Sequence, residues 1–267
     1  MTESFETLTK IGLYAGLLLA LGGSAASWLF PSPRAQRDWR VVSAALLVVL
    51  VSLVLRLLAH SVATFGDDGL SAESLDTVAL RSRWGGGWRL QGYAATIAAA
   101  LSFLAWSRPR LFATLATVAV CLLAATFPRL GHSAALPATS VIAAVHLLAA
   151  GGWVGTLAVL LMRGAPSVDW PRFSLVAASG VATLVITGLL LATSFVPTVS
   201  DLVSAAYGRL LLVKLLLFGA IGLCGALNWR RLHAREPGAQ PPLGRVEVAL
   251  AALLIVVTAF LTETAHP

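Results

Sequence analysis

The sequence has few charged residues and few residues that contain sulfur. Charged residues make up 12% of the 267 positions, hydrophobic residues make up 58%, and the mean hydropathy is +0.84. In a soluble globular domain about a quarter of the residues are charged, so this composition excludes a soluble domain and indicates an integral membrane protein. The two cysteines, Cys121 and Cys224, lie within apolar runs and form no C-x-x-C pair, so no disulfide framework is expected.

The sequence also lacks the motifs of hydrolytic and nucleotide-binding enzymes. The run Gly85-Gly86-Gly87 has neither the lysine nor the serine of a phosphate-binding loop. There is no nucleophile–base arrangement and no pair of catalytic carboxylates. Most lysines and arginines flank apolar segments, a placement that sets membrane orientation and accounts for the net charge of +7. We therefore expect no enzyme activity and no nucleic-acid partner.

Several apolar runs are long enough to cross a bilayer, which takes about 20 residues. They predict an all-α fold, a polytopic bundle of eight transmembrane helices in a single membrane domain over residues 1–267. The first run does not resemble a secretory signal, because Glu3 and Glu6 precede it and Lys10 is its only basic residue, so we expect it to remain as a helix. The fourth run is the shortest. The runs cover residues 9–30, 40–59, 88–107, 110–127, 138–162, 173–195, 208–229 and 245–263.

Arginine is concentrated on one side of the predicted bundle, and most acidic residues lie on the other. The positive-inside rule places the arginine-rich turns in the cytoplasm, so both termini are expected to face outwards. The basic residues of these turns and their flanks are Arg34, Arg37, Arg40, Arg108, Arg110, Arg163, Arg172, Arg230, Arg231, Arg235 and Arg245.

The chain contains a weak internal repeat. The segments "RWGGGWRLQGYAATIAAALSFLAWSR" and "AYGRLLLVKLLLFGAIGLCGALNWRR" both open with an aromatic residue close to glycine and close near a tryptophan and arginine. Trp84 precedes Tyr207, and Trp106 precedes Trp229, by the same 123 residues. The two copies are the third and seventh runs, four apart in helix order, so they point the same way. The pattern predicts a parallel 4+4 duplication with halves of about 1–129 and 130–267.

Four of the five histidines are predicted to lie towards the outer side of the membrane. His60 ends the second run, His132 precedes the fifth and His266 follows the last. His146 lies eight residues inside the fifth run, about 12 Å below its outer end at 1.5 Å per residue. Neutral imidazole is a good ligand for copper, zinc and iron. These four histidines therefore predict a metal site at the outer mouth of the bundle.

Two charged residues extend this predicted site. Glu263 lies three residues before His266 and offers a carboxylate, and the two residues together are expected to form a flexible outer clasp. Arg56 lies one turn before His60 on the same helical face, where it can snorkel outwards or pair with Glu263 or an anionic substrate.

Each of these residues also has a structural interpretation. His146 can form a hydrogen bond between helices as a structural polar residue. His132 can be a solvated loop residue, His60 an interfacial one, and His266 part of a disordered end. Trp153 lies seven residues after His146 and so on the same helical face, either beneath the histidine or as an ordinary aromatic of the bundle.

The apolar segments of the chain resemble those of a known family. The segments "VHLLAAGGWVGTLAVLL", "RFSLVAASGVATLVITGLLLA" and "YGRLLLVKLLLFGAIGLCGALNWRRL", and the ending "TAFLTETAHP", are similar to the membrane domain of the copper resistance protein D (CopD) family. The similarity is greatest from about 138 to 267, and the earlier segment "LDTVALRSRWGGGW" extends it over the chain.

This resemblance implies a bacterial inner-membrane protein that handles copper, so the termini that the loop charges place on the outer side are expected in the periplasm. Family members are thought to pass copper between periplasm and cytoplasm, and are fused to or partnered with a small periplasmic copper-binding protein of the CopC type. The match points first at His146, and then at His132 and His60. Cuprous ion prefers sulfur ligands, but Met1 and Met162 are the only methionines, so no sulfur path through the membrane is expected.

The sequence thus predicts a protein that binds a copper ion through histidines at its periplasmic mouth and supports copper uptake or handling. The first alternative is a membrane redox protein with haem b held between His60 and His146. The second is a non-transporting assembly partner of a copper enzyme.

Overall fold

The chain folds entirely into helices and their connecting turns, without a strand among the residues that the structure describes. This structure is a computed structural model. The all-α prediction is confirmed, and its physical reason is that a helix satisfies the backbone polar groups internally, as a lipid environment requires. The described residues are 2–31, 35–106, 109–130, 137–164, 168–196, 198–233 and 242–264.

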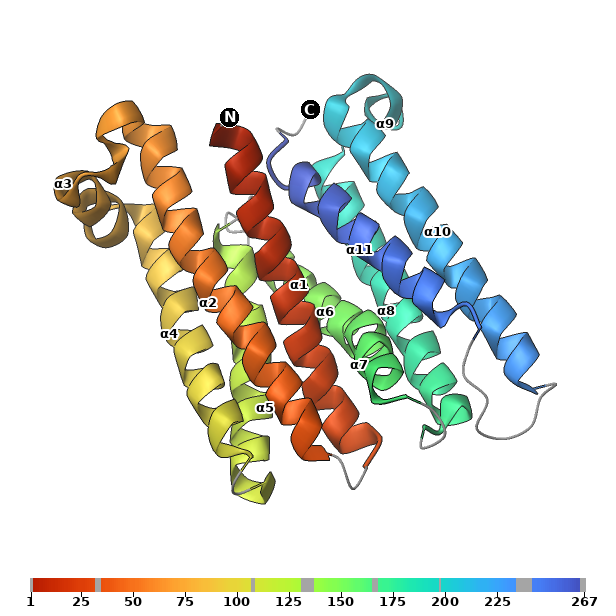
Figure 1. Cartoon of the computed structure of the whole chain (residues 1–267). Coiled ribbons are helices and arrows are strands. Elements are labelled where there is room, and N and C mark those ends of the chain that lie inside the picture. The colour runs from red at the N-terminus through yellow and green to blue at the C-terminus, as the bar shows by residue number, and fades with distance from the viewer. Residues whose placement is uncertain are drawn as a thin grey trace.

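The long helices form two neighbouring groups (Figure 1). The first group contains α1 (Thr2–Leu29), α2 (Ala35–Phe65), α4 (Arg83–Leu104) and α5 (Pro109–Thr126). The second contains α6 (Pro137–Ala150), α7 (Thr156–Arg163), α8 (Trp170–Phe195), α10 (Ala206–His233) and α11 (Gly244–Leu261). A π-helical segment, Gly151–Gly155 (η5), joins α6 and α7 into one continuous rod. The remaining short elements are η1 (Gly66–Leu70), α3 (Ala72–Asp76), η2 (Thr77–Arg81), η3 (Phe127–Leu130) and α9 (Asp201–Ser204).

Helix α1 begins, and helices α2 and α11 end, at the same end of the bundle, which we call the termini end (Figure 1). Helices α1, α7 and α10 end at the opposite end of the bundle. The start of α1 and the end of α11 therefore lie on one side of the bundle, as the loop charges predict.

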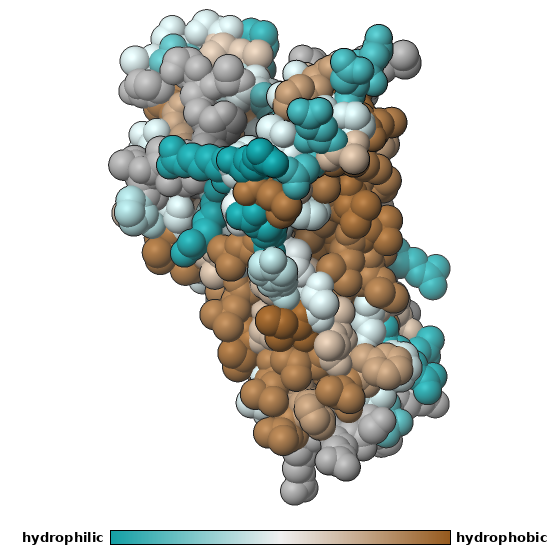
Figure 2. All heavy atoms as spheres, turned by 90° about the vertical axis from the view of Figure 1, so that its left-hand side faces the viewer, coloured by the Kyte–Doolittle hydropathy of each residue, from teal (hydrophilic) through white to brown (hydrophobic). Residues whose placement is uncertain are grey.

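Seven helical segments among the described residues are long and apolar enough to cross a membrane. They correspond to seven of the eight predicted runs, including the short fourth run, which forms α5. Figure 2 shows apolar side chains over the middle of the face that carries α3 and α4, with polar ones mainly towards its ends. A bundle of this kind fits a lipid bilayer. The segments are Phe5–Leu29, Gln36–Leu70, Leu111–Leu130, Pro137–Arg163, Trp170–Phe195, Ala206–Arg231 and Gly244–Leu261.

Helix α4, which contains the predicted third run, does not meet the same criterion. Its 22 residues include Arg83, Arg89 and Gln91, which lower its hydropathy. It nevertheless lies alongside α2 and α5 in the same layer (Figure 1). It also runs in the same direction as α10, the other copy of the predicted repeat. The count of eight spans and the duplication both stay predictions.

The apolar core is divided between the two groups of helices. Leu17, Leu46 and Val120 are completely buried among α1, α2, α4 and α5. A second cluster joins η5, α7, α8, α10 and α11, and it includes Leu160 and Ile221. The last turn of α1 also belongs to the second cluster. Helix α1 therefore has buried residues in both cores and links the two groups.

Polar residues at the helix ends explain where several helices begin and stop. The hydroxyl of Ser82 accepts a hydrogen bond from the backbone N–H of Gly85 at 2.8 Å and so caps the start of α4. Asp169 caps α8 in the same way through the N–H of Arg172, at 3.0 Å. Gly164 ends α7 with a φ of 75°, a conformation that favours glycine because it has no Cβ.

A buried ion pair links α1, α2 and α7 at the end opposite the termini. Arg163, the last residue of α7, donates through Nε to Oδ1 of Asp38 at 2.9 Å and through Nη2 to the other carboxylate oxygen. The same guanidinium donates to the backbone carbonyls of Phe30 at 2.7 Å and Ala26 at 2.9 Å. The Asp38 side chain is 1% exposed and that of Arg163 is 4% exposed. The pair therefore has its hydrogen bonds made within the protein.

Candidate functional site

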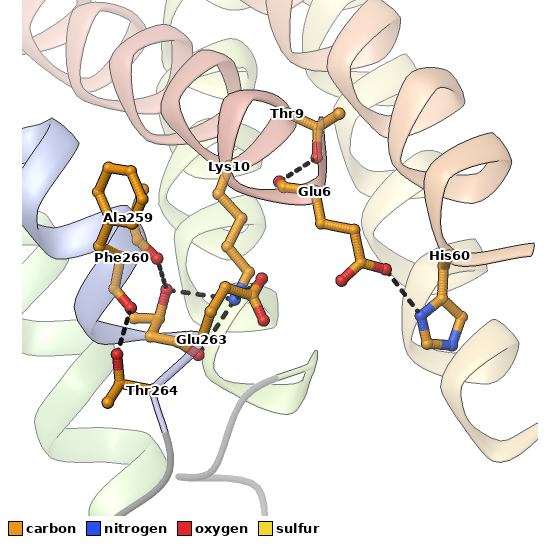
Figure 3. Close-up of polar contacts among 9 residues, drawn as sticks. Glu6, Thr9, Lys10, His60, Ala259, Phe260, Glu263 and Thr264 are labelled. Carbon is orange, nitrogen blue, oxygen red and sulfur yellow. Dashed lines mark hydrogen bonds and ion pairs between the residues drawn. The ribbon is translucent and has the colours of Figure 1, made fainter. Parts of the chain in front are cut away.

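His60 lies in the last turns of α2, between α1 and α4. Its Nδ1 is 3.3 Å from Oε1 of Glu6, and its ring stacks on Trp84 with centroids 4.1 Å apart and planes 15° apart. An ionised carboxylate only accepts hydrogen bonds, so Nδ1 carries the hydrogen. Nε2 has no hydrogen-bond partner among the described residues, and it lies on the side of the ring away from Glu6 (Figure 3). The His60 side chain is 34% exposed, which leaves this nitrogen available to a ligand.

Trp84 also contacts Arg56, whose Cζ lies 5.9 Å from the centroid of the indole. Arg56 and His60 therefore share one face of α2, as their spacing predicts. The guanidinium is within electrostatic range of the carboxylates of Glu6 and Glu263. It is attracted both to the π face of the tryptophan and to the two acids.

Lys10 connects the end of α11 to α1. Its Nζ is 2.5 Å from Oε1 of Glu263 and donates to the carbonyl and the hydroxyl of Thr262, at 3.2 Å each. The side chain of Lys10 is 8% exposed and that of Glu263 is 35% exposed. Figure 3 shows the Lys10 ammonium directed at the end of α11 and the Glu6 carboxylate directed at His60. The Glu263 carboxylate is therefore engaged by an ammonium group.

Glu6, Lys10, Arg56, His60 and Glu263 together form what we call the termini-end cluster. Glu6 and Lys10 lie one turn apart on α1, so one helix supplies both the acid for His60 and the cation for α11. The two carboxylates are balanced by two cations. A metal ion that arrives here meets carboxylates that are already paired. Nε2 of His60 is a nitrogen donor without a hydrogen-bond partner among these described side chains.

His146 lies in α6, and its interactions are with other helices. Its Nδ1 is 2.8 Å from the hydroxyl oxygen of Thr187 on α8, and Lys214 of α10 is within electrostatic range. The ring is half-buried and lies against α8, where a Cβ added to Gly188 would be 3.5 Å from Cε1. The structure thus brings Arg56, His60 and Glu263 into one cluster, whereas the interactions of His146 lie on α8 and α10.

The other predicted ligands lie outside the part of the chain that the structure describes. This holds for His132 and His266, and the side chain of His233 is not described either. Within the described ranges, no three His, Cys, Asp or Glu side chains are grouped so that they could hold a metal ion. The four-histidine site at the outer mouth therefore stays a prediction.

Trp153 belongs to the core of the second group of helices. It is 3% exposed, and its ring meets that of Phe218 on α10 edge to face with centroids 6.0 Å apart. A Cβ added to Gly180 on α8 would lie 3.0 Å from the Cβ of Trp153, so the indole also packs on α8. Trp153 and His146 both contact α8, at Gly180 and Thr187 respectively, consistent with their predicted common face.

Comparison with known protein families gives two matches along the chain. The family described as copper resistance protein D-like, N-terminal domain, matches residues 1–140, and the family described as copper resistance protein D matches residues 169–261. The chain belongs to the copper resistance protein D family. No curated protein and no solved structure matches it. Membership of the copper resistance protein D family identifies a membrane protein related to copper resistance.

The two family matches divide the candidate residues of this copper resistance protein D family member. Glu6, Lys10, Arg56 and His60 lie within the N-terminal match. Thr187 and Lys214, the partners of His146, lie within the second match. His146 and Trp153 themselves lie between the two matches, and Glu263 lies just beyond the second.

Four residues that the structure places in the termini-end cluster or beside these histidines are not identified as site residues by the sequence pattern. Glu6 and Lys10 have a signal in hindsight, because an acid and a base one turn apart at the start of an apolar run share one helical face. In the sequence, Trp84 is distinguished only as part of the internal repeat. Thr187 lies in the apolar run "TLVITGLLLAT" and has no local signal, because serine and threonine are common inside membrane helices.

Proposed function

We propose that this protein binds copper at the termini end as a non-catalytic step in copper handling, with His60 as an entry ligand. The observation that supports this most directly is the environment of His60. Its Nδ1 is held by Glu6 and its ring plane by Trp84. Histidines that ligate metals usually donate the other ring N–H to a carboxylate or similar acceptor, which fixes the ring and directs the free nitrogen at the metal. His60 has this arrangement.

We further propose that His146 is a second ligand, deeper in the membrane. Lys214 and His146 lie at similar distances from the starts of their helices, eight residues into α10 and nine residues into α6, or about 12–14 Å along the helix at 1.5 Å per residue. An ionisable residue at such a depth is by default a candidate for function. His132, His266 and Glu263 complete the proposed entry region, Glu263 by holding the end of α11 on Lys10.

The proposed topology has eight crossings, with α4 as the eighth. Two of its polar side chains face the protein: Gln91 is 1% exposed and donates to the carbonyl of Thr126 on α5 at 3.3 Å, and Ser102 is completely buried. Its exposed large side chains include Ile97 at 56% and Phe103 at 58%, which suit contact with lipid. With eight crossings, the positive-inside rule supports a termini end on the periplasmic side of the bacterial inner membrane, because the arginine-rich turns follow the opposite ends of the helices. Copper would arrive there from a periplasmic donor of the CopC type.

The proposal predicts that the imidazole of His60 contributes to copper binding. We expect His60→Ala to weaken Cu(I) binding by about tenfold or more, because the ion loses a nitrogen donor that no described neighbour can replace. The measurement is competition between the purified protein in lipid nanodiscs and a chromophoric Cu(I) chelator. His233→Ala is the matched control, since it removes a histidine at the opposite end of the bundle. Unchanged affinity and stoichiometry in His60→Ala would contradict the entry site.

Uptake is tested separately from binding. We propose that copper passes inwards from the periplasmic mouth, so cells that express His146→Ala should accumulate less copper than cells with the unaltered protein. Copper binding without any uptake by the unaltered protein would instead favour an assembly partner of a copper enzyme. A Soret band in the visible spectrum of the purified protein, at one haem per chain, would favour the haem b protein.

A further inference from the structure

Thr187 provides the hydrogen bond that His146 makes among the described residues. The hydroxyl oxygen of Thr187 is 2.8 Å from Nδ1 of His146, and the threonine is 7% exposed. The contact joins α6 to α8 across 41 positions of sequence. Water has little access to this hydroxyl, so its hydrogen-bond partners are fixed by the protein.

The hydroxyl hydrogen of Thr187 is already used. Thr187 donates to the backbone carbonyl of Thr183, one turn earlier on α8, at 2.6 Å. A hydroxyl has one hydrogen and two lone pairs, so towards His146 the oxygen is left as an acceptor. Nδ1 of His146 must then be the donor and carry the hydrogen.

A neutral imidazole has one N–H and one bare nitrogen, and the partner of the first decides the position of the second. With the hydrogen on Nδ1, Nε2 has a free lone pair, and it has no hydrogen-bond partner among the described residues. The ring also lies close to α8 at Gly188, where an added Cβ would be 3.5 Å from Cε1. We propose that Thr187 is a positioning residue that holds His146 with its hydrogen on Nδ1 and keeps Nε2 free to ligate copper.

This inference rests on the proposed function, in which His146 ligates copper, but its first consequence concerns the protein without metal. Nitrogen-15 NMR of histidine-labelled protein distinguishes an imidazole with hydrogen on Nδ1 from one with hydrogen on Nε2. We expect the His146 ring of the unaltered protein to carry its hydrogen on Nδ1. In Thr187→Val, which keeps the shape and removes the acceptor, we expect a mixture of the two forms.

The same variants predict the effect on copper. Loss of an outer-shell hydrogen bond to a metal ligand typically weakens metal binding by about 10–100-fold, and we expect a loss of this size at His146 in Thr187→Val. Thr187→Ser retains a hydroxyl and should restore both the ring form and the affinity. Thr183→Val is the matched control: its hydroxyl bonds to its own helix, at the carbonyl of Ser179, 2.9 Å away. Neither quantity should change in this control.

The outcomes separate the two proposals. If His146 of the metal-free protein carries its hydrogen on Nε2, or if Thr187→Val leaves the ring form unchanged, the positioning role is wrong whatever copper does. If the position of the His146 hydrogen changes in Thr187→Val as expected, but neither the unaltered protein nor the variant binds copper, the proposed function fails and the positioning role remains. Thermal unfolding of all three variants checks that they are folded, and the ring form of the unaltered protein provides the test should Thr187→Val fail to fold.

Discussion

Replacing Gly155 by alanine is expected to disrupt the contact between the two groups of helices. A Cβ at this position would overlap the backbone carbonyl oxygen of Leu18 on α1, and a Cβ on Gly22 would likewise overlap the backbone at Gly155. These are backbone atoms, so no side chain can rotate to make room, and α1 and η5 must separate. Overpacked sites usually cost about 1–3 kcal/mol, and a clash with backbone belongs at or above the upper value. The measurement is the thermal stability of the purified protein.

The same segment offers a matched control. A Cβ added to Gly152, three residues earlier in η5, would meet nothing within 4 Å. Gly152→Ala makes the same chemical change in the same π-helical segment and should leave stability nearly unaltered. A large loss in Gly152→Ala would indicate that the π-helical segment itself does not tolerate alanine. Equal stability of the two variants would contradict the close packing of α1 on η5.

The close crossing at Gly155 illustrates what the sequence could predict about the fold. The motif "GGWVG" predicts a helix that a neighbour approaches closely, and Gly155 and Gly151 both face α1. The motif does not identify α1 as that neighbour, and it does not predict the π-helical turn. Apolar runs fix the length of each helix, because each must span the hydrocarbon core, but they contain little information about which helices pack together.

The candidate site shows the same limit. Helical rise gives the depth of His146, and spacing gives the common face of Arg56 and His60, because both depend only on local geometry. The Lys10–Glu263 ion pair joins two helices at opposite ends of the sequence. Lys10 also donates to the neighbouring Thr262, which lies 252 positions later. Such a contact depends on the packing of all the intervening helices. For the same reason, the sequence predicts that His60 and His146 lie towards one side of the membrane, but it does not predict whether the two histidines contact the same residues.

Asp38 is expected to be among the least replaceable polar residues of the protein. Asp38→Ala would leave the Arg163 guanidinium, 4% exposed, with two backbone carbonyls but no counter-charge. Removing one partner of a buried pair costs about 3–5 kcal/mol, because the other charge stays buried and unpaired. The exposed pair of Asp76 and Arg81, 2.9 Å apart, is the matched control.

Both pairs join an aspartate to an arginine, so a difference between the two variants reports the effect of burial on the ion pair. Asp76→Ala should cost no more than about 1 kcal/mol, because solvent screens an exposed pair and replaces its partner. The double variant Asp38→Ala/Arg163→Met should recover part of the loss, as it removes the unpaired charge together with the acid. Thermal unfolding of the four proteins in the same lipid measures all of these effects. Equal losses of stability in Asp38→Ala and Asp76→Ala would mean that water reaches the Asp38–Arg163 pair. Burial of the ion pair would then not be what stabilises the link between α2 and α7.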